Sequence, residues 1–548
     1  MTEKIGSIHL KKKSRFPFNL ILAILGAFLF AASHPNILFT SGLSFLGYIA
    51  LIPLFLLIKR IHIKTSFVWG GFTGVCLYFL FNFWIIFFHP AAIYIIIAYY
   101  FIVYSLLFLV LKIIDLSFPK YGFIFEAIAW VAFEYIKTLM FMGYPYGILG
   151  YTQWKFPLLI RSASIFGVWG ISLILVFFSS LCAEIILKCM QGGNFRSIFA
   201  LYGKYAAAWL GCFFALIAYG LYAKQDYSAA EFKKIALIQP NTDPWIGNIE
   251  VYKRNFYTLK TLSENAISEH KDISLVVWPE TAFIPRIRWH YKYANDVEAA
   301  VLVRELLEFL NKQQVPFLIG NDDAVFKENT GKGSSSGRVD YNAALLFIPQ
   351  QNVIPPEPAT YRKMHLVPFT EHFPYKHIFP RIYAYLNENN THFWEKGEER
   401  TVFDVNGMKF GTPICFEDCF GYISADFVKK GACLIVNITN DAWAQSLVCQ
   451  NQHLSMAVFR AVENRVPLVR AASSGQTAYI DPNGSIKAEL TPFVSGFLIA
   501  EVPLLTERHK TVYSFAGDFF AQTALVLMFA VLCAAGVRFF KIGIGKRS

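Results

Sequence analysis

Long apolar runs separated by short polar segments fill the chain up to residue 223, and one more lies near the C-terminus. We interpret eight of these runs as membrane spans, because each is long enough to cross a hydrocarbon core of ~30 Å as a helix. They lie at about 16–35, 40–58, 66–88, 91–113, 122–142, 160–188, 205–223 and 518–540. This pattern predicts a multi-pass α-helical membrane domain.

A different pattern begins after residue 223, where short strand-like runs alternate with amphipathic helical runs. Strands are predicted at 234–239, 275–278, 317–320, 343–348, 401–405, 410–415, 434–438, 468–472, 477–480 and 496–502, and helices at about 249–268, 295–314, 419–430 and 451–464. Such alternation is typical of a layered α/β domain. We therefore divide the chain into a seven-span membrane domain (1–223), an α/β domain (224–517) and a last span with a basic tail (518–548).

Composition agrees with a membrane protein that carries one large soluble domain. The 548 residues are 55% hydrophobic, with a mean hydropathy of +0.41, which is too apolar for one soluble domain of this length. The net charge of +12 could indicate a nucleic-acid partner, but residues 231–515 carry 29 Lys and Arg against 31 Asp and Glu. The basic excess lies beside the spans, so we expect no nucleic-acid partner.

The distribution of positive charge predicts the orientation in the membrane. With a cytoplasmic N-terminus, seventeen Lys and Arg residues flank the inner ends of the spans, whereas the short outer loops hold only Lys155 and Arg161. Both termini are then cytoplasmic and residues 224–517 lie on the outer face. The first run, preceded by Lys11–Arg15, also resembles a cleavable signal peptide. We favour its retention, because its removal would leave seven spans and break the charge alternation.

The stretch 409–419 carries the first candidate for chemistry, Cys415. This thiol follows a strand-like run and precedes a predicted helix start at Glu417 and Asp418, where backbone N–H groups favour a thiolate. The alternatives are an inert packing cysteine and a disulfide with Cys419, which would silence the nucleophile. The spacing of cysteines and histidines matches no zinc motif, so we expect no metal.

Two further stretches supply candidate partners for this thiol. The apolar strand at 275–281 delivers Glu280 at its C-terminal end, and the stretch 361–374 places Lys363 and Glu371 among apolar neighbours. Strand ends at one edge of an α/β sheet face a common crevice, so Glu280, Lys363 and Cys415 can meet there.

Together these stretches resemble the nitrilase, or carbon–nitrogen hydrolase, superfamily. The similarity to the apolipoprotein N-acyltransferase family is more specific, through 278–281, 361–369 with Glu371, 143–153 and the flanking spans. The resemblance implies an αββα sandwich with a Glu-Lys-Cys triad. Cys415 would be the nucleophile, Glu280 the general base, and Lys363 the cation that stabilises the oxyanion together with the N–H of Phe416.

The resemblance also assigns supporting residues. Glu371 would orient Lys363 or support the base, and Glu417 and Trp245 match further positions that matter in the family. The alternatives are a solvated helix-start carboxylate for Glu417 and a loop aromatic covering the core for Trp245. The chain departs from the family at Phe416, where Tyr is usual, and at Ala444-Gln445, where an aromatic residue and Gly are usual.

The implied activity moves an acyl chain from a membrane phospholipid, through a Cys415 thioester, to the N-terminal amine of a diacylglyceryl-modified apolipoprotein at the bacterial inner membrane, without a cofactor. One rival is a membrane-tethered amidase or nitrilase with water as acceptor. Another is a transporter or receptor without chemistry, against which the complete triad argues. Glu126, Glu134 and Glu184 lie within predicted spans, where carboxylates mark functional or paired positions.

Overall fold

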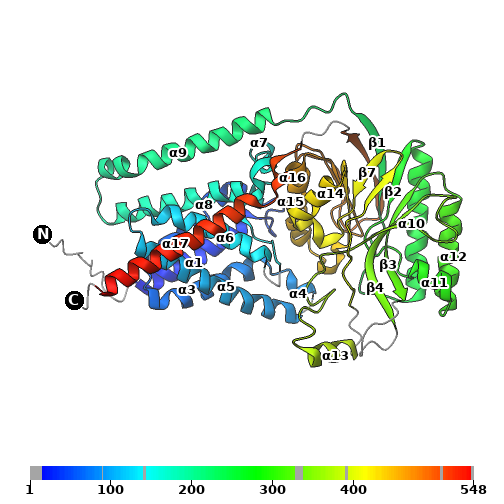
Figure 1. Cartoon of the computed structure of the whole chain (residues 1–548), viewed down its shortest axis with the longest axis horizontal. Helices are drawn as coiled ribbons and strands as arrows, with labels where there is room; N and C mark the ends of the chain where they lie inside the picture. Colours follow the sequence, from blue (N-terminus) through cyan, green and yellow to red (C-terminus); the bar gives the residue numbers. More distant parts are fainter. Residues whose placement is uncertain are drawn as a thin grey trace.

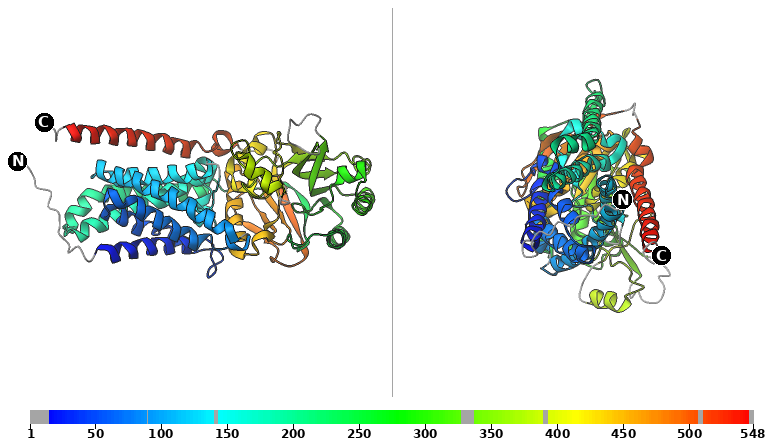
Figure 2. Two further views of the ribbon diagram at one scale, coloured as in Figure 1. Left: turned by 90° about the horizontal axis from the view of Figure 1, so that it is seen from below. Right: turned by 90° about the vertical axis from the view of Figure 1, so that its left-hand side faces the viewer.

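The structure is a computed structural model that describes residues 15–88, 90–139, 143–326, 337–388, 393–505 and 510–544. Lys4, Lys11 and Arg547, which contribute to the predicted charge asymmetry, lie outside these residues. A helical bundle occupies one end of the molecule and two β-sheets with their covering helices occupy the other (Figure 1). Helix α1 begins and α17 ends at the end of the bundle far from the sheets (Figure 2).

The bundle contains long helices joined by short helical turns. They are α1 (Arg15–Ser33), η2 (Ser44–Tyr48), α2 (Ile52–Arg60), α3 (Ile63–Phe81), α4 (Ile85–Phe88), α5 (Pro90–Ser117), α6 (Gly122–Leu139), η3 (Leu149–Gln153), α7 (Pro157–Ile160), α8 (Ala163–Met190), α9 (Phe195–Tyr222) and α17 (Phe519–Ile544). Among the described residues, six helices are long and apolar enough to cross a membrane: α1, α3, α5, α8, α9 and α17.

Two of the eight predicted spans differ from this finding. The prediction of a single span at 40–58 was wrong: the segment divides into η2 and α2, and the nine residues of α2 reach only about 14 Å. At 122–142 the helix α6 does form, but Glu126, Glu134 and Lys137 make it too polar to count as an apolar span.

Two of the bundle's carboxylates share a partner on α2. Lys59 Nζ lies 2.8 Å from Glu184 and 3.3 Å from Glu126, and its side chain is 3% exposed. Glu134 instead accepts a 2.9 Å hydrogen bond from the N–H of Leu149. The costly burial of these charges is therefore offset by pairing, which makes them part of the packing between helices.

The α/β part contains two mixed six-stranded sheets. The first has the order β12–β1–β2–β3–β4–β5, with β12 (Gly496–Leu504), β1 (Glu231–Gln239), β2 (Ile273–Val277), β3 (Phe317–Phe326), β4 (Arg338–Phe347) and β5 (Ala359–Arg362). The second has the order β11–β10–β9–β8–β7–β6, with β11 (Ile486–Glu489), β10 (Ala478–Ile480), β9 (Leu468–Ala472), β8 (Leu434–Thr439), β7 (Met408–Gly411) and β6 (Val402–Val405). Parallel pairs occupy the centre of each sheet and antiparallel pairs its edges.

Alternating side chains build the layers, because successive residues of a strand face opposite sides of its sheet. In β1, Ile235 and Leu237 join the core shared with the second sheet, whereas Ala236 and Ile238 pack with the helices on the outer face. Those helices are α10 (Ile249–Glu269), α11 (Ile287–Tyr293) and α12 (Val297–Asn311). On the second sheet, α14 (Gly421–Lys429) and α15 (Leu447–Asn464) lie between the strands and the bundle (Figure 1).

The strand predictions were nearly complete but missed β5 and β11. The strand expected at 410–415 ends earlier, at Gly411, and beyond it Ile414 makes only an isolated bridge to Ile438. Cys415 therefore lies four residues beyond the end of β7. Four short helical elements complete the described fold: α13 (Pro380–Glu388), α16 (Val512–Ala516) and the 3-10 turns η4 (Cys415–Cys419) and η5 (Asp441–Ala444).

Helix α15 joins the bundle to the sheets. Its Gln452 donates hydrogen bonds to the carbonyls of Pro35 and Phe81 at 3.1 and 3.2 Å, and it accepts one from Trp84 at 3.1 Å. One continuous apolar core runs from the bundle through α15 into both sheets. The bundle and the α/β part therefore hold each other in a fixed relation.

Candidate active site

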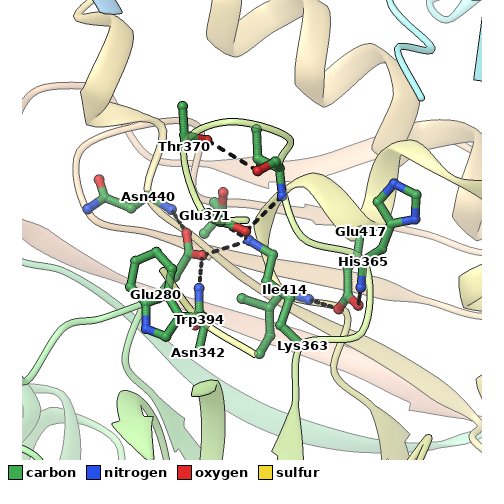
Figure 3. Close-up of polar contacts among 12 residues, drawn as sticks. Glu280, Asn342, Lys363, His365, Thr370, Glu371, Trp394, Ile414, Glu417 and Asn440 are labelled. Atoms are coloured by element: carbon green, nitrogen blue, oxygen red, sulfur yellow. Dashed lines mark hydrogen bonds and ion pairs between the residues drawn. The ribbon is translucent and has the colours of Figure 1, made fainter. Parts of the chain in front are cut away.

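Glu280 lies just past the C-terminal end of β2, in a position that the packing of β3 makes possible. A Cβ on Gly320 of β3 would lie 2.2 Å from the carbonyl oxygen of Pro279, so only glycine permits this approach. The Glu280 carboxylate is 4% exposed and accepts hydrogen bonds from Asn342 Nδ2 at 2.8 Å and from the Asn440 N–H at 3.0 Å (Figure 3). Both bonds aim the carboxylate into the space between the sheets.

Lys363 follows β5 and is fully buried. Its N–H donates to the carbonyl of Asn342 at 2.8 Å, which continues the strand pairing by one residue. Its Nζ donates to Glu280 Oε1 at 3.1 Å and to Glu371 Oε1 at 2.7 Å (Figure 3). Burial alone would lower the pKa of Lys363, but Glu280 and Glu371 raise it well above its usual value. The side chain is therefore a permanent cation.

Glu371 completes this arrangement from the segment that follows Lys363. Its Oε2 accepts a 3.0 Å hydrogen bond from the N–H of Val367, which holds the carboxylate toward the lysine. Burial raises the pKa of Glu371, an effect that the charge of Lys363 opposes. This direct contact is consistent with the predicted role of Glu371 in orienting Lys363.

Cys415 begins η4 (Cys415–Cys419) in the left-handed region, with φ of +50°. A non-glycine residue in this region is strained, and such strain accumulates at functional sites. Burial raises the pKa of the Cys415 thiol, as does Glu280, while Lys363 and His453 act in the opposite direction. The expected stabilisation of the thiolate does not prevail, because burial and Glu280 outweigh the opposing charges of Lys363 and His453. The thiol needs a base, and the structure leaves it as a free cysteine, unpaired with Cys419.

Glu417 is completely buried, so its interpretation as a solvated carboxylate was wrong. Its Oε2 accepts from the N–H of Ile414 at 2.8 Å, and its Oε1 accepts from the N–H groups of Met364 and His365 at 2.9 and 3.0 Å. Tyr361 donates its hydroxyl to both oxygens. Glu417 thus joins the turn that carries Cys415 to the segment that carries Lys363 (Figure 3).

The two aromatic candidates lie at the periphery of the triad. Phe416 is 8% exposed and packs edge-on against Phe420, with ring centroids 5.1 Å apart. Trp245 is 52% exposed and packs edge-on against Trp443 of η5 at 5.0 Å. Its interpretation as an aromatic that covers the core does not fit this exposure. Trp245 instead covers the loop that begins with Asn440, whose N–H donates a hydrogen bond to the Glu280 carboxylate.

No role was predicted from the sequence for Asn342, Asn440 or a group of buried charges beside η4. Asn342 lies directly before the apolar half of β4, and its polarity at the edge of that run was the one available signal. Asp418, Cys419 and His453 offer three possible metal ligands within 4.8 Å of one another. Arg470 also donates to Asp418, and a second carboxylate, Asp441, faces the histidine. Such a set fits an ion-pair network rather than a metal site, because the guanidinium already neutralises the carboxylate.

Comparisons with known proteins give consistent family assignments for the helical bundle and for the α/β part of the chain. The carbon–nitrogen hydrolase family matches residues 234–509, and the apolipoprotein N-acyltransferase N-terminal domain matches residues 25–181. An apolipoprotein N-acyltransferase 1 of Treponema denticola is 60% identical over 94% of this chain and 96% of its own length, and one of Treponema pallidum is 45% identical over 94% and 95%. The apolipoprotein N-acyltransferase of Borreliella burgdorferi is 28% identical over 93% and 94%. A solved structure of Saccharomyces cerevisiae Nit3, of the nitrilase superfamily, covers 52% of this chain and 93% of its own at 23% identity, with a TM-score of 0.36.

Proposed function

Since the chain belongs to the apolipoprotein N-acyltransferase family, we propose that it transfers an acyl chain from a membrane phospholipid, through a thioester on Cys415, to the N-terminal amine of a diacylglyceryl-modified apolipoprotein. The observation that carries the assignment of residues is the position of the Lys363 cation between the carboxylates of Glu280 and Glu371, beside a strained, partly buried thiol. Three residues then act directly in the reaction: Glu280, Lys363 and Cys415.

In the first step Glu280 takes the proton of the Cys415 thiol as the sulfur attacks the ester carbonyl of the phospholipid. The high pKa of this thiol makes a base necessary. The oxyanion that develops lies near the Lys363 ammonium and the N–H of Phe416, and a well-placed donor of this kind contributes about 3–4 kcal/mol. When the C–O bond breaks, Glu280 returns the proton to the leaving alkoxide, and lysophospholipid departs.

In the second step the amine of the acceptor attacks the thioester carbonyl. Glu280 accepts a proton from the attacking nitrogen, the C–S bond breaks, and the proton passes to the Cys415 sulfur. The product is an amide, and the enzyme returns to its starting state. Passing through a thioester divides one difficult transfer into two easier steps.

The membrane bundle gives both lipid substrates access to this site. The six apolar helices suit a multi-pass protein of the bacterial inner membrane, and α15 places the nucleophile turn directly above the bundle. The positive-inside charge distribution supports an orientation with the α/β part on the periplasmic face and both termini in the cytoplasm.

Intact mass measurement of the purified protein tests the proposal. Incubation with a defined phospholipid and no acceptor should add one acyl mass that hydroxylamine removes. Cys415→Ser should gain no mass, whereas Cys433→Ser, which alters another partly buried cysteine of the α/β part, should react like the wild type. A diacylglyceryl-cysteine peptide should then discharge the adduct as an amide.

Two outcomes would contradict this assignment. An adduct that water discharges as fast as the peptide does would indicate a hydrolase. The lack of any adduct on folded protein would exclude the phospholipid thioester.

A further inference from the structure

Four buried charged side chains form a closed ring beside the turn that carries Cys415. Asp418 comes from η4, Asp441 from η5, His453 from α15 and Arg470 from β9. Asp418 and Arg470 are fully buried, and His453 and Asp441 are 3% and 7% exposed. The chemistry derived above uses none of them, although a buried set of charges needs a reason to persist.

Each carboxylate of the ring contacts both the imidazole and the guanidinium. His453 Nε2 lies 2.5 Å from Asp418 Oδ1, and His453 Nδ1 lies 2.9 Å from Asp441 Oδ1. Arg470 donates to Asp418 Oδ2, and it donates to Asp441 Oδ2 at 2.6 Å. Two carboxylates, a guanidinium and an imidazole therefore close a continuous ring that joins four separate elements.

The two carboxylates of the ring favour the charged form of the His453 imidazole. Burial and Arg470, whose Nη2 lies 2.8 Å from Nδ1, lower the pKa of His453, but Asp418, Cys419 and Asp441 raise it to well above its usual value. Both ring nitrogens face a carboxylate, so both are held as donors. Two negative and two positive charges then balance, and removal of one leaves its partners uncompensated.

The ring is joined through short stretches of chain to both members of the proposed proton-transfer pair. Asp418 lies three residues after Cys415 in η4. Asp441 directly follows Asn440, whose N–H donates to Glu280 Oε2 at 3.0 Å. One carboxylate of the ring therefore anchors the segment of the nucleophile, and the other anchors the loop that orients the base.

We infer that His453 is a positioning residue: through Asp418 and Asp441 it locks the Cys415 turn against the Asn440 loop. This inference rests on the proposed roles of Cys415 and Glu280. It goes beyond them, because it assigns a function to a histidine that touches neither substrate nor the reacting atoms. The charge of His453 also lowers the pKa of the Cys415 thiol, an effect that Asp441 opposes.

A pair of amide substitutions separates the two contacts of the imidazole. His453→Asn keeps a nitrogen near the Nδ1 position, facing Asp441, and His453→Gln keeps one near the Nε2 position, facing Asp418. Both remove the charge. In each variant we expect thioester formation with phospholipid, followed by intact mass, to be ~10–100-fold slower, the scale of a misplaced reacting group. The pH at which the rate is half-maximal should rise, because the thiolate loses a nearby cation.

The control is His34→Gln, which removes another buried imidazole, bonded to the carbonyls of Phe30 and Ile148 in the bundle. It should leave the pH midpoint unchanged. If the His453 variants do not fold, Asp441→Asn replaces them, because it keeps the shape of the side chain and breaks the same ring. Its rate should fall in the same way, but its pH midpoint should fall rather than rise, since Asp441 raises the pKa of the Cys415 thiol.

The outcomes separate this inference from the proposed function. Folded variants that keep the wild-type rate and pH midpoint, or that lose rate in proportion to stability with an unchanged midpoint, would overturn the positioning role alone. A wild-type protein that forms no hydroxylamine-labile adduct would overturn the proposed function, and this inference with it.

Discussion

Lys363 lies 2.7 Å from Glu371, closer than the 3.1 Å that separates it from Glu280. The lysine is thus shared between two carboxylates rather than paired with one. If Glu371 lost its charge, the Lys363 ammonium would be free to move fully onto Glu280. The second carboxylate therefore holds the ammonium in a position between the two acids.

The first prediction follows from this sharing. Glu371→Gln should slow thioester formation by ~100-fold, comparable to the loss of one well-placed donor in an acyl-transfer site. The measurement is the single-turnover rate of adduct formation, with Glu264→Gln, on the exposed face of α10, as the charge-matched control. A rate within twofold of the wild type would show that Glu280 alone is enough to hold the Lys363 ammonium in place.

A second prediction concerns Glu417, whose two oxygens accept hydrogen bonds from three backbone N–H groups and from the Tyr361 hydroxyl. In Glu417→Gln one oxygen becomes an amide nitrogen that faces other donors. A buried donor without an acceptor costs about 1–3 kcal/mol, so the free energy of unfolding should fall by that amount. Thermal unfolding in detergent measures the fall. Because Glu417 joins the Cys415 and Lys363 segments, adduct formation should slow as well; a stable variant with full activity would refute the linking role.

The periodicity of the sequence predicted most of this fold, because strands buried on both faces and long apolar helices leave strong local signals. It failed where the signal is weak or misleading. The strands β5 and β11 have four residues each, and at 40–58 an apolar run was taken for a span although Pro53 opens a separate short helix there. At 122–142 an apolar span was predicted despite Glu126 and Glu134, because the residues around them are apolar.

The candidate site divides in the same way. Glu280, Lys363, Glu371 and Cys415 could be predicted because each stands in a short stretch that resembles a family motif, and the structure places the first three in hydrogen-bond contact. The ring around His453 could not be predicted, because Asp418 and Arg470 are 52 residues apart in sequence and meet only through the packing of four elements. The true environment of Glu417 was also out of reach, since its donors come from the distant Lys363 segment.

A third prediction concerns pH and Asp322. Burial raises the pKa of Asp322 to about 7, against the charge of Arg286 and a 3.0 Å hydrogen bond from Trp394. The folded protein therefore binds this proton more tightly than the unfolded chain does. Its contribution to stability is present below about pH 4 and is lost as the pH rises to about 7.

Asp322→Asn tests that dependence. The variant keeps the size of the side chain but cannot ionise, so its melting temperature should decline less than that of the wild type between pH 4 and 7. The backbone N–H of Trp394 also donates to the carbonyl of Glu371. The same variant therefore reports on the segment that carries Glu371. Parallel curves for the two proteins would show that Asp322 ionises at an ordinary pH.

The last prediction concerns the contact between the bundle and the nucleophile turn. Arg460 of α15 donates to the carbonyl of Cys419 at 3.2 Å and to the Tyr151 hydroxyl at 3.2 Å, and it pairs with Glu463 at 3.0 Å. Tyr151 belongs to η3 in the bundle, so this arginine ties a membrane element to the end of η4. Tyr151→Phe removes one hydrogen bond and leaves the ring in place.

We expect Tyr151→Phe to slow adduct formation by about 2–10-fold, since one such bond contributes about 0.5–1.5 kcal/mol and Arg460 keeps its other partners. Tyr202→Phe is the matched control, because Tyr202 donates a buried hydrogen bond to Glu184 within the bundle, away from η4. That variant should lose stability without a specific loss of rate. Equal rate losses in both variants would mean that the bundle affects the nucleophile through overall stability, whereas a loss confined to Tyr151→Phe would establish the Arg460 contact as the route by which the bundle holds the Cys415 turn.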